Sequence, residues 1–138
     1  MTAIFVYGLL KNYTDAKQEA WVSGYRLIDL GYFPAAIPDN IDYDSKLGLF
    51  NKHIICGQLI YVDKETLHNF DILEGCPNFY YRQVINIEVP SGDTTEIVLG
   101  QMYCLTNRFW HLRNWCRQTS KLTTTNKGLD IYYEYQTK

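Results

Sequence analysis

The 138-residue sequence lacks several features that would assign it to a specialised class of protein. Lys and Arg number 13 against 15 Asp and Glu, and the two signs are interleaved, so there is no basic stripe of the kind that binds nucleic acid. The first residues, MTAIFVYG, contain neither a basic segment nor a long apolar run. We therefore expect no nucleic-acid partner, no signal peptide and no membrane-spanning helix.

Cysteine and histidine are sparse and scattered. The four cysteines have no CxxC spacing, and the three histidines never approach the spacing of zinc ligands. Because a chain of this length can bury about two thirds of its unfolded surface, it needs no disulfide to fold. We therefore expect no metal site, and four reduced thiols in a cytoplasmic protein. The residues concerned are Cys56, Cys76, Cys104, Cys116, His53, His68 and His111.

Three aspartates, Asp39, Asp42 and Asp44, lie close together in the sequence. An EF-hand calcium loop needs a glycine at its sixth position and a closing glutamate, and the spacing here does not match. We interpret residues 39–48 as a solvated acidic loop.

Aromatic residues are abundant, at 15% of the chain, and twelve of them are tyrosine. This composition favours strands and a hydroxyl-rich pocket over a coiled coil or a disordered tail. Gly57, inside one expected strand, indicates a bulge, a bend or the close approach of another backbone. The main expected strands are 3–7, 54–62, 79–89 and 96–105, the last two forming a hairpin around a turn at 90–93.

Shorter segments complete the expected chain. The pattern predicts helices at 15–21, 64–73 and 107–116, one or two strands within 25–33, a proline-bracketed piece at 35–37 restricted to an edge or a turn, a polar loop at 118–128, and a last strand or wrapping segment at 129–135. No repeat or linker divides the chain, so we expect a single domain over residues 1–138. These elements favour an α+β fold, a small mixed and partly closed β-barrel with two or three short helices outside. The mouth of such a barrel is a common place for a small-ligand pocket.

The expected helix 64–73 directs one carboxylate inward. Asp63 can serve as its N-cap, Leu67 and Phe70 define its apolar stripe, and continuing that stripe to i+7 gives Glu74. Gly75 ends the helix directly after that residue.

An inward carboxylate is unfavourable unless it is paired or neutral, and such groups cluster at functional sites. The alternatives for Glu74 are a structural ion pair with Arg82 and a fraying helix end that carries the side chain to the surface.

The first expected strand ends in Tyr7 and Gly8. A sharp turn at this point can expose successive backbone N–H groups, and such concavities bind carboxylates and other anions. A Tyr-Gly pair alone is equally consistent with an ordinary turn from strand to loop.

Three segments together resemble the gamma-glutamylcyclotransferase-like family. They are FVYGLLK at 5–11, GQLIYVD at 57–63 and LHNFDILEGCPNFYYR at 67–82. The pattern Glu-x-Cys-Pro-x-x-Tyr-x-Arg in the third segment is most similar to the gamma-glutamylamine cyclotransferases. The resemblance covers residues 3 to about 103, in the same order and with similar spacing.

The resemblance implies a compact mixed barrel with one pocket and no metal or organic cofactor. It also implies that Glu74 is the catalytic acid/base, and that the backbone of Tyr7, Gly8, Leu9 and Leu10 holds a small γ-glutamyl substrate. One position departs from the family, which usually has Ser or Thr where this chain has Leu9. The departure is tolerable if the segment acts through its N–H groups.

Two aromatic or charged neighbours complete the expected site. We expect Tyr80 to donate a hydrogen bond near the substrate carbonyl, and Arg82 to form a structural ion pair with Asp71. Two other classes of function stay open at this point. One is a non-catalytic module of the same fold that binds an amino-acid-like ligand, and the other is an interaction protein with a tyrosine-rich surface.

Overall fold

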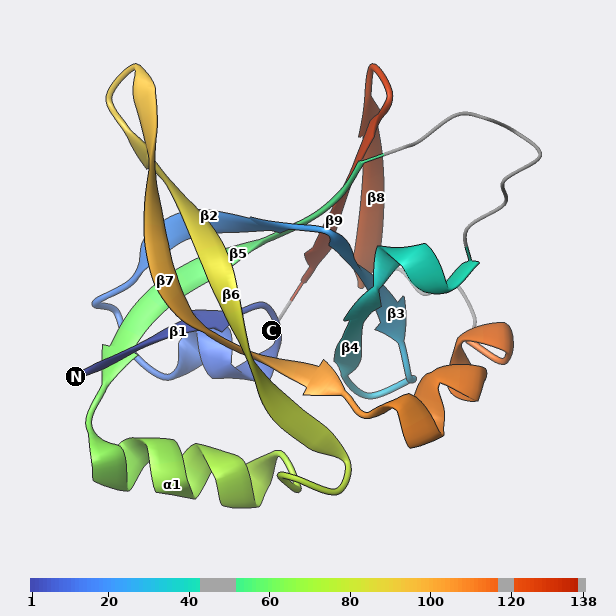
Figure 1. Cartoon of the computed structure of the whole chain (residues 1–138), viewed down its shortest axis with the longest axis horizontal. Coiled ribbons are helices and arrows are strands. Elements are labelled where there is room, and N and C mark those ends of the chain that lie inside the picture. Colours follow the sequence, from blue (N-terminus) through green and yellow to red (C-terminus); the bar gives the residue numbers. More distant parts are fainter. Residues whose placement is uncertain (43–51, 117–120, 137–138) are drawn as a thin grey trace.

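The computed structural model describes residues 1–42, 52–116 and 121–136, and its centre is a closed ring of five strands. Around the ring, β1 pairs with β5, β5 with β2, β2 with β6, β6 with β7, and β7 with β1 (Figure 1). The strands are β1 Thr2–Val6, β2 Gln18–Ser23, β5 His53–Val62, β6 Tyr80–Ser91 and β7 Thr94–Leu105. The predicted small, mixed α+β barrel is thus confirmed, and its four main strands share one sheet.

Strand β1 is buried on both faces, as its uninterrupted apolar sequence predicts. It runs antiparallel to β5 and parallel to β7. Glycines on both neighbours permit this close contact. A Cβ atom on Gly57 would lie 2.4 Å from the Val6 carbonyl oxygen, and one on Gly100 would lie 2.8 Å from that of Ala3. Of the three interpretations of Gly57, close backbone approach is therefore supported.

The remaining elements lie outside the ring. Helix α1, Lys64–Leu73, crosses the bottom of the view in Figure 1, and strand β4 lies between β3 and β7 rather than at an edge, with prolines at its two ends. The outer strands are β3 Tyr25–Asp29, β4 Pro34–Pro38, β8 Leu122–Lys127 and β9 Asp130–Tyr135, and the 3₁₀ helices are η1 Leu9–Asn12, η2 Asp39–Asp42 and η3 Asn107–Asn114.

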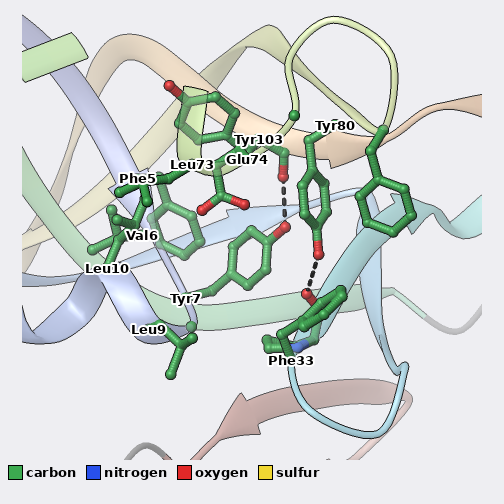
Figure 2. Close-up of a pocket in the computed structure, with 14 residues that line it drawn as sticks. Phe5, Val6, Tyr7, Leu9, Leu10, Phe33, Leu73, Glu74, Tyr80 and Tyr103 are labelled. Atoms are coloured by element: carbon green, nitrogen blue, oxygen red, sulfur yellow. Dashed lines mark hydrogen bonds between the residues drawn. The ribbon is translucent and has the colours of Figure 1, made fainter. Parts of the chain in front are cut away.

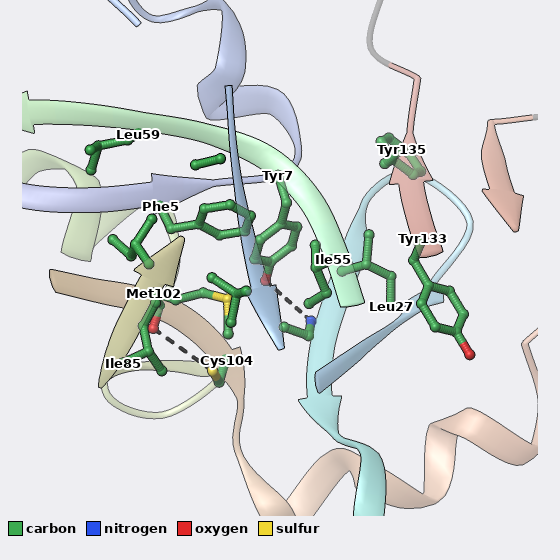
Figure 3. Close-up of a cluster of buried hydrophobic side chains, with 14 of the residues drawn as sticks. Phe5, Tyr7, Leu27, Ile55, Leu59, Ile85, Met102, Cys104, Tyr133 and Tyr135 are labelled. Atoms are coloured by element: carbon green, nitrogen blue, oxygen red, sulfur yellow. Dashed lines mark hydrogen bonds between the residues drawn. The ribbon is translucent and has the colours of Figure 1, made fainter. Parts of the chain in front are cut away.

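Two hydrophobic clusters stabilise this arrangement. The first fills the inside of the barrel, with Phe5, Leu59 and Met102 among its members (Figure 3). The second joins the outer face of the ring to α1 through Phe70 and Ile60. Because alternate residues of β1 enter different clusters, this strand connects the barrel interior to the helix.

The predicted helix at 15–21 is wrong. Residues Gln18–Ser23 form β2, which pairs with β5 along its whole length. Ala20 and Val22 are buried while their neighbours are more exposed, which is the period of a strand. Tertiary pairing overrides the weak helical pattern there.

The predicted polar loop at 118–128 is also wrong in its second half, because Leu122–Lys127 form β8 and pair with β9. The threonines at 123–125 are β-branched and favour a strand. The last strand is confirmed as β9, and the helix expected at 107–116 is the 3₁₀ helix η3. The acidic loop begins as η2, and its residues 43–48 lie outside the described part of the chain.

Candidate functional site

A pocket of about 440 Å³ opens where the end of β1, the end of α1 and the start of β6 meet. Every residue that the sequence singled out for the site lines it, namely Tyr7, Gly8, Leu9, Leu10, Glu74 and Tyr80. The other residues that line the pocket are Phe5, Val6, Phe33, Pro34, Leu73, Gly75, Phe79 and Tyr103 (Figure 2). Segments far apart in the sequence therefore build one cavity.

The end of α1 fixes the backbone of Glu74, its C-cap residue. Gly75 follows with φ +63°, and its N–H donates to Ile72 O, while the Cys76 N–H donates to Asp71 O. This pair of bonds is a Schellman motif, in which glycine adopts the left-handed conformation without steric penalty. The Asp63 carboxylate caps the other end through the Thr66 N–H at 2.8 Å, as predicted.

The Glu74 carboxyl group points into the pocket, toward the rings of Phe5 and Tyr7 (Figure 2). Burial raises its pKa from 4.5 to about 7. Within the described ranges no ion pair or hydrogen bond to its side chain is present, and Arg82 is paired elsewhere. The structural alternative for Glu74, an ion pair with Arg82, is therefore wrong.

This buried acid should make stability depend on pH. In the unfolded chain Glu74 ionises near pH 4.5, whereas in the folded protein it stays protonated until about pH 7. Folding is therefore opposed increasingly as the pH rises between these values. Glutamine does not titrate, so we expect the free energy of unfolding of Glu74→Gln to rise by roughly 1–2 kcal/mol relative to that of the wild type as the pH goes from 4.5 to 8. This is less than the full pKa shift implies, because the pocket is open to water. Urea unfolding of both proteins across that range measures the difference, and parallel stability curves would contradict it.

The turn after β1 leaves three backbone donors free. In the part of the chain that the structure describes, the N–H groups of Gly8, Leu9 and Leu10 donate no hydrogen bond, while the Gly8 and Leu10 carbonyls accept from Lys11 and Tyr13. Gly8 is buried against Pro34, and a Cβ atom on it would lie 3.0 Å from Pro34 Cγ. Because all three residues line the pocket, their N–H groups are the candidate donors for a ligand there.

The tyrosine hydroxyls of the pocket are used within the protein. Tyr7 donates to the Tyr103 carbonyl at 2.6 Å and accepts from the Ala36 N–H at 3.2 Å. Tyr80 donates to the Pro34 carbonyl at 2.8 Å, so its single proton is directed away from a ligand. Its oxygen can still accept a hydrogen bond.

A polar network lies behind the pocket. Arg82 Nε is 3.0 Å from Asp71 Oδ1, the ion pair expected from the sequence, and Arg82 Nη1 donates to Gln101 Oε1 at 2.8 Å. The Tyr103 hydroxyl donates to the same Asp71 oxygen at 2.6 Å. Asp71 belongs to α1, Arg82 to β6, and Gln101 and Tyr103 to β7, so this network ties the helix to the two strands. Arg82 itself does not line the pocket.

We expect Arg82→Gln to destabilise the fold by about 1–2 kcal/mol, between the effects of exposed and buried pairs, since both side chains are half-buried. The kcat/KM of any activity in the pocket should change less than about threefold, because Arg82 does not line the pocket. Denaturant titration and steady-state kinetics test both statements. Arg108→Gln on the exposed face of η3 is the control, and a large loss of activity with unchanged stability would contradict a structural role.

Sequence reasoning missed the aromatic side of the pocket. The ring centroids of Phe33 and Phe79 are 6.0 Å apart and those of Phe79 and Tyr80 are 4.9 Å apart, and both pairs meet edge to face. Phe79 stands next to Tyr80 in the third segment and was detectable there. Phe33 comes from the β3–β4 connection, and nothing in its local sequence marks it.

Within residues 1–42, 52–116 and 121–136, no three His, Cys, Asp or Glu side chains gather as metal ligands would. The same residues contain no helix that is both long and apolar enough to cross a membrane. All four cysteines are free thiols.

Comparison with known proteins gives a consistent family and fold. The family model described as "Gamma-glutamyl cyclotransferase, AIG2-like" matches residues 4–122. No curated protein sequence matches.

Two solved structures share the fold. The crystal structure of an AIG2-like protein from Mus musculus superposes with a TM-score of 0.61 at 19% identity, covering 86% of each chain. An Arabidopsis thaliana protein solved in solution superposes with a TM-score of 0.59 at 20% identity, covering 83% of this chain and 79% of its own. At these identities the likeness concerns the fold alone.

Proposed function

Because the chain belongs to the gamma-glutamyl cyclotransferase, AIG2-like family, we propose that it converts a γ-glutamyl amide into 5-oxoproline and a free amine, with Glu74 as the general acid/base. One observation carries the proposal. A carboxyl group with a pKa of about 7 and no partner among the described residues shares a pocket with three unused backbone donors.

The substrate supplies its own nucleophile. The α-amino nitrogen of a γ-glutamyl group reaches the γ-carbonyl carbon through a five-membered ring, so the attack is intramolecular. A carbon–nitrogen bond forms in the ring, and the bond to the leaving amine breaks. The protein therefore needs chiefly to fold the substrate and to move protons.

Glu74 suits the proton transfers. The α-ammonium must first lose a proton to solvent, and the same nitrogen loses a second proton as the ring closes, while the leaving nitrogen must gain one. The ionised Glu74 carboxylate accepts the proton of the attacking nitrogen and, once protonated, donates it to the leaving nitrogen. A pKa near the working pH suits both halves of this cycle.

The turn after β1 suits the anchoring role. The N–H groups of Gly8, Leu9 and Leu10 can hold the substrate α-carboxylate, as backbone concavities hold anions. This role depends on the backbone alone, so a leucine at position 9 is compatible with it. Tyr80 is better suited to accept a hydrogen bond from the substrate nitrogen than to donate one, since its proton is on Pro34 O.

A non-catalytic binding module is the second candidate, favoured by Leu9 in place of the hydroxyl residue that the resemblance leads us to expect. Incubation with γ-glutamyl amides, followed by chromatographic detection of 5-oxoproline, separates the two. Product formed by the wild type and lost in Glu74→Gln supports the enzyme. Binding without product supports the module.

A further inference from the structure

The walls of the Glu74 pocket carry little charge. Among the lining residues that the structure describes there is no lysine, arginine or histidine, and Glu74 is the one carboxylate. Two leucines at its edge, Leu9 and Leu73, are 62% and 75% exposed. A substrate that enters or leaves therefore passes apolar side chains.

From these walls we infer that the protein releases an apolar amine, an arylalkyl or alkyl amine that carries no charged group besides its reacting nitrogen. The inference rests on the proposed function and adds to it the chemical class of the leaving group. The γ-glutamyl amides of apolar amines are thus the expected substrates, in preference to γ-glutamyl amino acids and γ-glutamyl diamines, whose leaving groups carry a further charge.

A leaving group that carries a carboxylate would be poorly matched. The unused donors found in the pocket are the N–H groups of the turn after β1, and the α-carboxylate of the glutamyl part occupies them in the proposed mechanism. The three tyrosine hydroxyls that line the pocket donate to protein oxygens. A second carboxylate would lose water without gaining a donor, which is unfavourable.

A leaving group that carries an ammonium would be poorly matched as well. It requires an anionic partner, and Glu74 is engaged with the two reacting nitrogens. The nearby Asp71 carboxylate does not line the pocket, and it is held by Arg82 and Tyr103. The pocket thus selects against either sign of charge.

The aromatic wall gives an apolar amine a surface to pack on. Phe33, Phe79 and Tyr80 contact one another edge to face, which fixes the orientation of their rings. Figure 2 shows Phe33 and Leu9 on the side of Tyr7 away from the Glu74 carboxyl group. An amine side chain that extends from the reacting nitrogen to this end of the pocket meets carbon atoms on both sides.

A second hollow continues this surface. It shares Phe33 and Phe79 with the Glu74 pocket and adds Leu112 and Trp115, the latter 78% exposed. Its one carboxylate among the described residues, Asp29, is buried and accepts a hydrogen bond from the Gly31 N–H at 2.8 Å. Longer apolar groups therefore have further apolar surface beyond the aromatic wall.

Two matched pairs of substrates test the inference. γ-Glutamylphenethylamide and γ-glutamylphenylalanine differ by one carboxylate, and γ-glutamylpentylamide and γ-glutamylcadaverine differ by one ammonium. We expect kcat/KM for the uncharged member to exceed that for the charged member by about tenfold or more in each pair. Binding of all four to Glu74→Gln, measured by calorimetry, should rank them in the same order.

The outcomes separate this inference from the proposed function. Turnover of all four with equal kcat/KM, or with preference for a charged member, overturns the inference and leaves the cyclotransferase activity standing. No turnover with selective binding of the uncharged members overturns the activity and retains the apolar selectivity. Neither turnover nor selective binding overturns both.

A substitution at the rim makes the test sharper. Leu9→Lys places an ammonium beside the leaving group. The ratio of kcat/KM for γ-glutamylphenethylamide to kcat/KM for γ-glutamylphenylalanine should therefore fall by about tenfold. The uncharged control Leu9→Gln should change this ratio much less. Because a ratio is compared, a general loss of activity in either variant cancels. An unchanged ratio in Leu9→Lys would contradict the assigned position of the leaving group.

Discussion

Glu74→Gln should reduce turnover of a γ-glutamyl amide by about 100-fold or more, within the range of general acid–base catalysis. Glutamine keeps the shape of the side chain but cannot take up and return a proton. Substrate affinity should change little, because the proposed anchor is the turn at Gly8, Leu9 and Leu10. Single-turnover assays and calorimetry measure the two quantities separately.

The control for this substitution is Glu65→Gln, which removes an exposed carboxylate from the first turn of the same helix. It should leave turnover unchanged. The urea unfolding of Glu74→Gln described above also shows whether the variant is folded at the assay pH, so a loss of activity through unfolding is recognised directly. Equal single-turnover rates for Glu74→Gln and the wild type would contradict the proposed role.

Gly8→Val should reduce kcat/KM by about 100-fold, mainly through KM, because small displacements of an anchoring group have effects of that size. A Cβ atom at this position would already lie 3.0 Å from Pro34 Cγ and 3.2 Å from Pro34 Cδ, and the two further carbons of valine add to the crowding, so the turn or the Pro34 ring must move. Kinetics and calorimetric binding of substrate report the loss, and thermal unfolding reports stability. Binding should be damaged more than stability, since the turn lies at the end of β1 rather than within it.

The double variant Gly8→Val/Pro34→Ala tests the cause. Alanine lacks the two ring carbons that meet the new side chain. Gly8→Val should therefore weaken substrate binding less in the Pro34→Ala background than in the wild type. Absence of any recovery, or a loss of stability that accounts for the whole loss of binding, would contradict the anchoring role.

Local sequence predicts the half of the site that comes from single segments. The N-cap at Asp63, the stripe of Leu67 and Phe70 and the stop at Gly75 define α1 and place Glu74 at its end, and the structure has each of these features. The ion pair of Arg82 with Asp71 follows from the same stretch. These predictions succeed because capping, helical periodicity and glycine turns act over a few residues.

The other half depends on contacts between distant segments. Phe33 and Pro34 reach the pocket because β4 pairs with β3 and with β7, and no local pattern predicts that placement. The hydroxyl of Tyr80 binds the Pro34 carbonyl, 46 residues away in sequence, so its direction was not predictable from the segment around Glu74. The error at β2 has the same origin, because pairing with β5 and β6 decides its conformation.

The pH dependence of single turnover with γ-glutamylphenethylamide tests the central claim most directly. Burial raises the pKa of Glu74 to about 7, so the rate of the wild type should rise with pH through a step near that value as the carboxylate forms. The substrate amine titrates in both proteins, so a step that the wild type has and Glu74→Gln lacks belongs to Glu74. A step shared by both proteins, or a wild-type rate with no step between pH 5 and 8, would contradict the assignment of Glu74 as the acid/base.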